Sequence, residues 1–183
     1  KAAYQPGWGK LMGEAGDAID RARARGVDVA ADLYLYTAGG TGLEATIPSW
    51  AFEGGSQKLL ERLKDPATRA RLKNEQKTGS PGWWNIIEAS GGWDNIILAG
   101  ARNPENKRFE GKSLSQIAKE WNKEPADAAF DLVAAGSGRV VAIYHMMSEQ
   151  DIETALRFPW TSIGSDAGAS EKVGDIDAIG LAH

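Results

Sequence analysis

The sequence contains no cysteine, which excludes a disulfide framework and a thiolate metal site. Its two histidines, His145 and His183, lie too far apart to form a zinc motif with local spacing. No run of about 18 apolar residues occurs, so we expect no membrane span. The net charge is −4 and the basic residues are spread along the chain, which argues against a nucleic-acid partner.

The remaining composition is typical of a folded domain. Apolar residues make up 42% and charged residues 25% of the 183 positions, which suits one globular unit with a core. The chain starts without a methionine or a signal peptide, and it ends at His183 without a closing helix or strand. We therefore expect a segment of a longer polypeptide. The lack of cysteine fits any compartment, among which we favour the cytoplasm.

Hydrophobic periodicity predicts an α/β fold. Residues 10–25 suit a helix, and residues 27–36 suit a largely buried strand. Nearer the C-terminus, a strand at 140–145, a helix at 149–157 and a strand at 160–164 follow one another. A helix that leads into an apolar strand is the repeating step of parallel α/β folds.

The middle of the chain predicts a long, mainly helical segment between these strands. Residues 37–50 are rich in Gly and Thr and predict a loop, and residues 56–76 predict a helix. A short strand at 95–99 and helices at 113–122 and 125–135 follow. At about 90 residues, the segment is too long for a plain crossover, so we interpret it as an insertion that covers a sheet or barrel.

Candidate functional side chains stand at the ends of predicted strands. Asp166 could face a metal or a polarised water, although an Asp after a strand is more often a turn former or a helix cap. Tyr34 and Tyr36 share one face of their strand, so either could donate a hydroxyl to a ligand; packing against neighbours is the alternative. The glycine clusters lack the Gly-Lys-Ser/Thr of a phosphate loop, and no Gly-x-Ser-x-Gly elbow occurs.

A series of short motifs runs along nearly the whole chain. They are, in order, Asp32-Leu33-Tyr34-Leu35-Tyr36-Thr37-Ala38-Gly39, Leu43, Pro48-Ser49-Trp50, Glu53-Gly54-Gly55, Leu63-x-Asp65-Pro66-x-x-Arg69, Gly111-Lys112-Ser113 with Ile117-Ala118, Met147-Ser148-Glu149-x-Asp151 and Ile163-Gly164-Ser165-Asp166. Together and in this order they resemble the D-aminoacylase / N-acyl-D-amino-acid deacylase group of the amidohydrolase superfamily.

This resemblance implies part of a TIM-like, metal-dependent amidohydrolase barrel with a mostly helical insertion. Residues 27–37 would form the seventh barrel strand, and residues 160–166 the eighth. The resemblance thus divides the chain into a barrel segment at 1–37, an insertion or lid at 38–138, and a second barrel segment at 139–183.

The resemblance also implies site residues. Asp166 matches the aspartate of strand eight, which binds or faces the metal and passes a proton from the bound water to the leaving amine. Lys1 and Tyr34 would hold the substrate carboxylate with a cation and a hydroxyl. Thr41 is the candidate substitute for a family hydroxyl residue, because Gly40 stands in its place. His183 would open the family's His-Pro-Arg segment.

The chain departs from the family pattern in several places. The His-x-His of strand one, the metal-bridging residue and the histidines of strands five and six are absent, so most ligands of one or two Zn²⁺ ions would lie outside this chain. Leu35 replaces the usual proline between the tyrosines. Three or fewer barrel strands cannot close a barrel, so we expect this chain alone to be inactive.

The resemblance predicts hydrolysis of the amide bond of N-acyl-D-amino acids by an enzyme of which this chain is a part. Its partners would be the small-molecule substrate and the remainder of the parent polypeptide. Two alternatives stay open. One is a related amidohydrolase that acts on cyclic amides or dipeptides, and the other is a non-catalytic fragment or binding module with the same fold.

Overall fold

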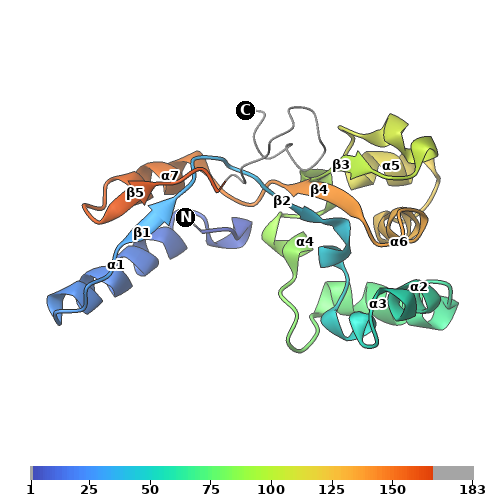
Figure 1. Cartoon of the computed structure of the whole chain (residues 1–183), viewed down its shortest axis with the longest axis horizontal. Helices are drawn as coiled ribbons and strands as arrows, with labels where there is room; N and C mark the ends of the chain where they lie inside the picture. Colours follow the sequence, from blue (N-terminus) through green and yellow to red (C-terminus); the bar gives the residue numbers. More distant parts are fainter. Residues whose placement is uncertain (1, 167–183) are drawn as a thin grey trace, which may run out of the picture. The chain divides into compact units, whose positions relative to one another are not determined.

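The computed structural model describes residues 2–166, which form two compact units. The terminal unit combines the chain up to Ala38 with the chain from Met146 onward, and the central unit spans Gly39–His145 (Figure 1). No helix of the described residues is long and apolar enough to cross a membrane. Each unit has its own strands and core, so each is described by itself.

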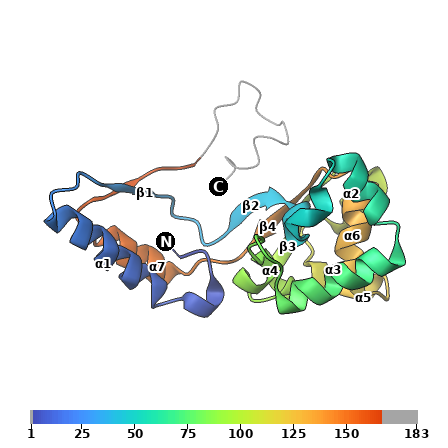
Figure 2. The ribbon, with the colours of Figure 1, turned by 90° about the horizontal axis from the view of Figure 1, so that it is seen from below.

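The terminal unit is built on a two-stranded parallel sheet. Its elements are η1 (Gln5–Gly7), α1 (Leu11–Ala24), β1 (Ala31–Leu33), α7 (Glu149–Leu156) and β5 (Thr161–Ile163). β1 pairs with β5 so that Asp32 stands opposite Ser162. Helices α1 and α7 contact each other, and α7 also contacts both strands (Figure 2). The core between helices and sheet consists of Met12, Leu33, Ile152 and Ala155, with Phe158 packed against it.

Strand β1 is shorter and more exposed than the sequence predicts. Of the apolar run at 27–36, only Ala31–Leu33 pairs with another strand. Within β1 the buried residue is Leu33. Leu35 and Tyr36 are exposed. The run resembles a strand buried on both faces, but among the described residues β1 has one neighbouring strand and helices on one face. The parallel direction and the flanking helices agree with the prediction.

The central unit contains a three-stranded antiparallel sheet in the order β2-β4-β3, covered by short helices. β4 pairs with both neighbours, and a register shift interrupts its pairing with β3 between Leu98 and Gly100. The elements are β2 (Gly39–Gly42), η2 (Leu43–Thr46), η3 (Ser49–Phe52), α2 (Ser56–Arg62), α3 (Pro66–Thr78), α4 (Ile86–Ala89), η4 (Trp93–Asn95), β3 (Ile96–Ala101), η5 (Pro104–Phe109), α5 (Leu114–Glu120), α6 (Pro125–Ala135) and β4 (Val140–Tyr144).

Three details of the central unit differ from the sequence prediction. The predicted loop at 37–50 holds an edge strand and two 3-10 turns. The predicted helix at 56–76 is broken into α2 and α3, because Asp65 caps a new helix and Pro66 takes its first position. Strand β4, which the sequence analysis grouped with the segment 139–183, is the middle strand of the antiparallel sheet. The central compact unit ends at His145. The division into barrel segments and an insertion at 38–138 stays a prediction.

The turn η2 is anchored by two fully buried side chains, Leu43 and Ile47. It packs against α6 and β4, which supply buried aliphatic and aromatic residues such as Phe130 and Tyr144. The Tyr144 hydroxyl donates a hydrogen bond of 2.9 Å to the Gly42 carbonyl at the end of β2. These contacts hold the backbone of residues 42–47 against the core.

The cap of α5 offers a test of this fold. The Ser113 hydroxyl accepts a hydrogen bond from the Gln116 N–H, and the Gln116 side chain accepts one from the Ser113 N–H. Replacing Ser113 by Ala leaves the Gln116 N–H without its partner, so we expect the free energy of unfolding to fall by about 1 kcal/mol. Urea denaturation measures the change. Ser115→Ala, in the same helix but outside the cap, is the matched control, and an equal loss in both variants would contradict the assignment.

Candidate functional site

Tyr34 and Asp166 lie at the same edge of the terminal sheet. Tyr34 follows β1 and Asp166 follows β5 with two residues between, and the carboxyl ends of parallel strands meet at one edge. Burial, and then the negative charge of Asp166, raise the pKa of the Tyr34 hydroxyl above its usual value. The structure thus brings together two of the residues that the sequence analysis singled out.

Asp166 is exposed and has a positive backbone φ of 53°. That left-handed conformation is uncommon for residues other than glycine, although Asp adopts it more readily than most. Gly164, two residues earlier, donates its N–H to the Leu33 carbonyl at 3.0 Å, which extends the pairing of the two segments beyond β5. The backbone that carries Asp166 is therefore held beside the end of β1.

A cavity of about 210 Å³ lies beside Tyr34. Its other lining residues are Ala3, Asp32, Leu33 and Met147, all from the terminal unit. Asp32 accepts a hydrogen bond from the Ser162 hydroxyl, which ties β1 to β5 at this cavity. The Tyr34 and Tyr36 rings lie 5.9 Å apart, in agreement with the prediction that they share a face.

The N-terminal segment reaches this cavity through Ala3. Two contacts hold the segment near the start of α7: the Trp8 indole donates to the Met146 carbonyl at 2.9 Å, and the Gly9 N–H donates to the Asp151 carboxylate at 3.0 Å. Lys1, the predicted cation for the substrate carboxylate, lies outside the described residues, as does His183.

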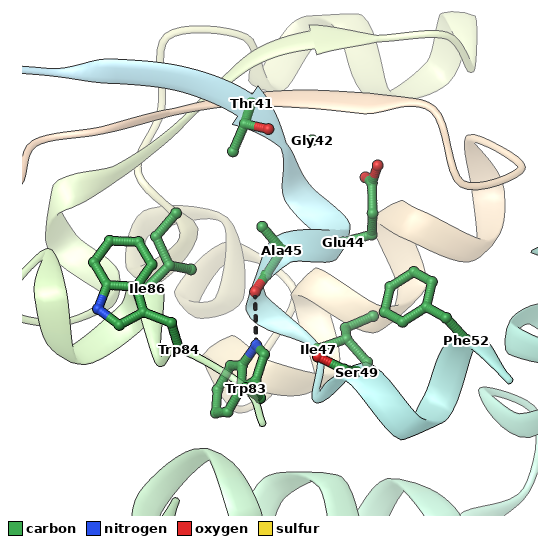
Figure 3. A pocket seen from close by; sticks show the side chains of 10 residues that line it. All are labelled: Thr41, Gly42, Glu44, Ala45, Ile47, Ser49, Phe52, Trp83, Trp84 and Ile86. Atoms are coloured by element: carbon green, nitrogen blue, oxygen red, sulfur yellow. Dashed lines mark hydrogen bonds between the residues drawn. The ribbon is translucent and has the colours of Figure 1, made fainter. Parts of the chain in front are cut away.

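Thr41 belongs to the central unit. It lies on β2, opposite Ala142 of β4, and its side chain is exposed. It lines a pocket of about 490 Å³, which we call the central pocket. Figure 3 shows the residues around it, which are Thr41, Gly42, Glu44, Ala45, Ile47, Ser49, Phe52, Trp83, Trp84 and Ile86.

Sequence reasoning missed Glu44, which lines the central pocket. The side chain is half-buried, and burial raises the pKa of its carboxyl group, an effect that a hydrogen bond from its own backbone N–H partly offsets. The residue stands in a Gly- and Thr-rich stretch that the sequence presents as a loop, so no periodic pattern marks it. Its burial arises because Leu43 and Ile47 anchor the turn on either side of it.

The described residues by themselves do not form a metal centre. Residues 2–166 contain no group of three or more His, Asp or Glu side chains placed to hold one ion. Asp166 follows β5 in the terminal unit, and His145 follows β4 in the central unit. A zinc ion at Asp166 would therefore need further ligands from residues that the structure does not describe.

The sequence matches no protein-family model and no curated protein. Solved structures with a similar fold exist. A D-aminoacylase structure said to define a novel subset of amidohydrolases is 24% identical, with a TM-score of 0.53 over 89% of this chain and 24% of that chain. A second D-aminoacylase structure, described in connection with its binuclear metal centre, is 24% identical, with a TM-score of 0.50 over 85% of this chain and 22% of its own.

An N-acyl-D-glutamate deacylase from Bordetella bronchiseptica, solved with zinc and a phosphonate inhibitor, is 23% identical, with a TM-score of 0.49 over 82% of this chain and 21% of its own. The chain spans less than a quarter of the length of each of these three proteins. The resemblance seen in the sequence is thus found again in the structure. The chain has a mixed α/β fold similar to part of the D-aminoacylase structures.

Proposed function

We propose that this chain is part of a metal-dependent amidohydrolase that cleaves the amide bond of N-acyl-D-amino acids. The observation that carries the proposal is the placement of Tyr34 and Asp166 together at the carboxyl edge of β1 and β5. Catalytic residues of α/β barrels lie at that edge of the strands. The ordered motifs and the fold similarity to D-aminoacylase structures support the same function.

The roles of the two residues follow from their charges. The Asp166 carboxylate is exposed and can accept a proton and later donate it to the leaving amine. A tyrosine hydroxyl is protonated at neutral pH at its ordinary pKa, and the pKa of Tyr34 is raised further, so the hydroxyl can donate a hydrogen bond to a substrate carboxylate. Lys1, which lies outside the described residues, is the proposed further contact of that carboxylate. Zinc, when bound, would polarise the amide carbonyl, with most of its ligands supplied by the parent polypeptide.

The terminal unit has the local features of a barrel segment. Its two strands are parallel, helices cover one face, and Val27, Leu35 and Ile163 are exposed apolar residues. Parallel sheets are normally buried on both faces, so exposed apolar side chains beside these strands indicate that further elements cover them. We therefore assign the terminal unit to the barrel and the central unit, Gly39–His145, to the insertion, with the parent polypeptide as the partner that completes the sheet.

The first test is a hydrolysis assay on the full polypeptide with N-acetyl-D- and N-acetyl-L-amino acids. We expect turnover of the D-enantiomers, loss of turnover with a chelator, and recovery with Zn²⁺. Asp166→Asn should lower kcat at least about 100-fold because the proton carrier is removed. Asp28→Asn, an exposed carboxylate of the same unit, is the matched control.

Three results would count against the proposal. Full activity in Asp166→Asn would exclude the role of that carboxylate. Metal-dependent cleavage of cyclic amides or dipeptides, without cleavage of N-acyl-D-amino acids, would indicate a related amidohydrolase. A full polypeptide that binds no metal and cleaves none of these substrates would indicate a binding module.

The neighbourhood of Tyr34 and Asp166 has its own test. Because the Asp166 charge raises the pKa of Tyr34, Asp166→Asn should lower that pKa, while burial keeps it above the ordinary tyrosine value. Ultraviolet difference titration of tyrosinate formation measures the shift, and Tyr34→Phe identifies the component that belongs to Tyr34. Asp166→Glu, which keeps the charge, should retain the raised pKa. An unchanged titration in Asp166→Asn would show that the two side chains do not interact.

A further inference from the structure

The residues that lead into α7 are hydrogen-bonded to two segments that border the cavity beside Tyr34. The Trp8 indole donates to the Met146 carbonyl at 2.9 Å, which attaches the N-terminal segment (Figure 2). The Met147 N–H donates to the Thr37 carbonyl at 3.0 Å, which attaches the chain that leaves β1. Met147 is also a lining residue of that cavity. The start of α7 thus links the N-terminal segment to the chain that carries Tyr34.

Asp151, in the first turn of α7, holds the N-terminal segment at a second point. Its Oδ1 atom accepts a hydrogen bond of 3.0 Å from the Gly9 N–H. Its own N–H donates to the hydroxyl of Ser148, the N-cap of α7, which fixes the backbone of Asp151. Asp151 is only 1% exposed, and its Oδ2 atom makes no hydrogen bond within residues 2–166. The contact with Gly9 is therefore made by a deeply buried carboxylate.

The turn η1 transmits these contacts to the wall of the cavity. The Gly7 N–H donates to the Tyr4 carbonyl at 2.9 Å, and the Trp8 N–H donates to the Gln5 carbonyl at 3.1 Å. Ala3, which lines the cavity, directly precedes this hydrogen-bonded turn. A hydrogen bond that holds residue 8 or 9 therefore also restricts the position of Ala3.

Burial of the Asp151 carboxylate has a cost that the packing of α7 does not require. A buried polar atom without a partner costs free energy. The neighbouring core residues of α7, Ile152 and Ala155, are apolar. An apolar side chain at position 151 would avoid the cost as well, but it would offer the Gly9 N–H no acceptor. The carboxylate therefore serves the hydrogen bond that holds the N-terminal segment.

We propose that Asp151 is a positioning residue for substrate binding, because it holds the segment 3–9 as a preformed wall of the cavity beside Tyr34. The ligand of that cavity is the carboxylate-bearing substrate, so the proposal rests on the proposed function. A wall that is already in place spares the substrate the entropic cost of ordering it, which raises affinity. The proposed contacts of the substrate are Tyr34 and Asp166, so Asp151 acts through the segment and not on the reacting atoms.

Steady-state kinetics of the full polypeptide with N-acetyl-D-amino acids test the proposal. Asp151→Ala should raise KM at least about 10-fold, because the wall must then order as the substrate binds, while kcat changes by less than about 3-fold. Asp151→Asn keeps an oxygen that can accept from the Gly9 N–H, so its KM should stay within about 3-fold of that of the unchanged protein. Comparison of the two variants separates the acceptor from the charge.

Trp8→Phe tests the same wall without altering a buried residue, since Trp8 is 39% exposed. It removes the indole N–H that binds the Met146 carbonyl, and should raise KM at least about 3-fold with little change in kcat. Trp160→Phe is the matched control. It removes the indole N–H that binds Asp20 of α1 in the same unit, a contact outside the N-terminal segment, and should leave KM unchanged.

Amide hydrogen exchange gives a readout that does not depend on hydrolysis. The Gly9 amide should exchange at least about 10-fold faster in Asp151→Ala than in the unchanged protein or in Asp151→Asn. Equal exchange in all three proteins, an unchanged KM in Asp151→Ala and Trp8→Phe, or an equal rise of KM in Trp160→Phe would overturn the proposal alone. An unchanged polypeptide that cleaves no N-acyl-D-amino acid would defeat the proposed function and this proposal with it, so the two failures are distinguished.

Discussion

The parallel pairing of β1 with β5 is the constraint on which the terminal unit depends. The pairing joins segments far apart in the chain: Asp32 and Ser162, which are hydrogen-bonded across it, are separated by 130 positions. Closing so long a loop has an entropic cost that local contacts cannot offset. The central unit lowers this entropic cost, because its first strand, β2, pairs with its last, β4. In this pairing Gly39 stands opposite Tyr144. The chain therefore enters and leaves the central unit at neighbouring points.

That pairing also sets the chemistry of the candidate site. Two parallel strands present their carboxyl ends at one edge, and the chain places a tyrosine after one strand and an aspartate after the other. Burial, and then the negative charge of Asp166, raise the pKa of the Tyr34 hydroxyl above its usual value. A hydroxyl donor and a carboxylate thus stand together at this edge of the sheet.

The central unit shows how apolar packing can leave a charge in an unfavourable place. Leu43 and Ile47 are fully buried and fix the turn η2 against β4 and α6. Glu44 lies between them in a half-buried position, where its carboxylate faces Gly42 and one of its oxygens has no hydrogen-bond partner within residues 2–166. The burial that accompanies this packing raises the pKa of the carboxyl group.

The amino-acid sequence by itself determined the order and type of most elements, because helix periodicity, caps such as Asp65-Pro66 and Ser113, and apolar strand runs are local signals. It also marked Tyr34, near the end of one such run, and Asp166, which follows another. The tertiary structure alone decided that β4 belongs to the antiparallel sheet, because an apolar run does not specify which strands pair with it. The tertiary structure alone also decided the burial of Glu44. That burial depends on how distant elements pack around the turn, and no periodic sequence pattern indicates it.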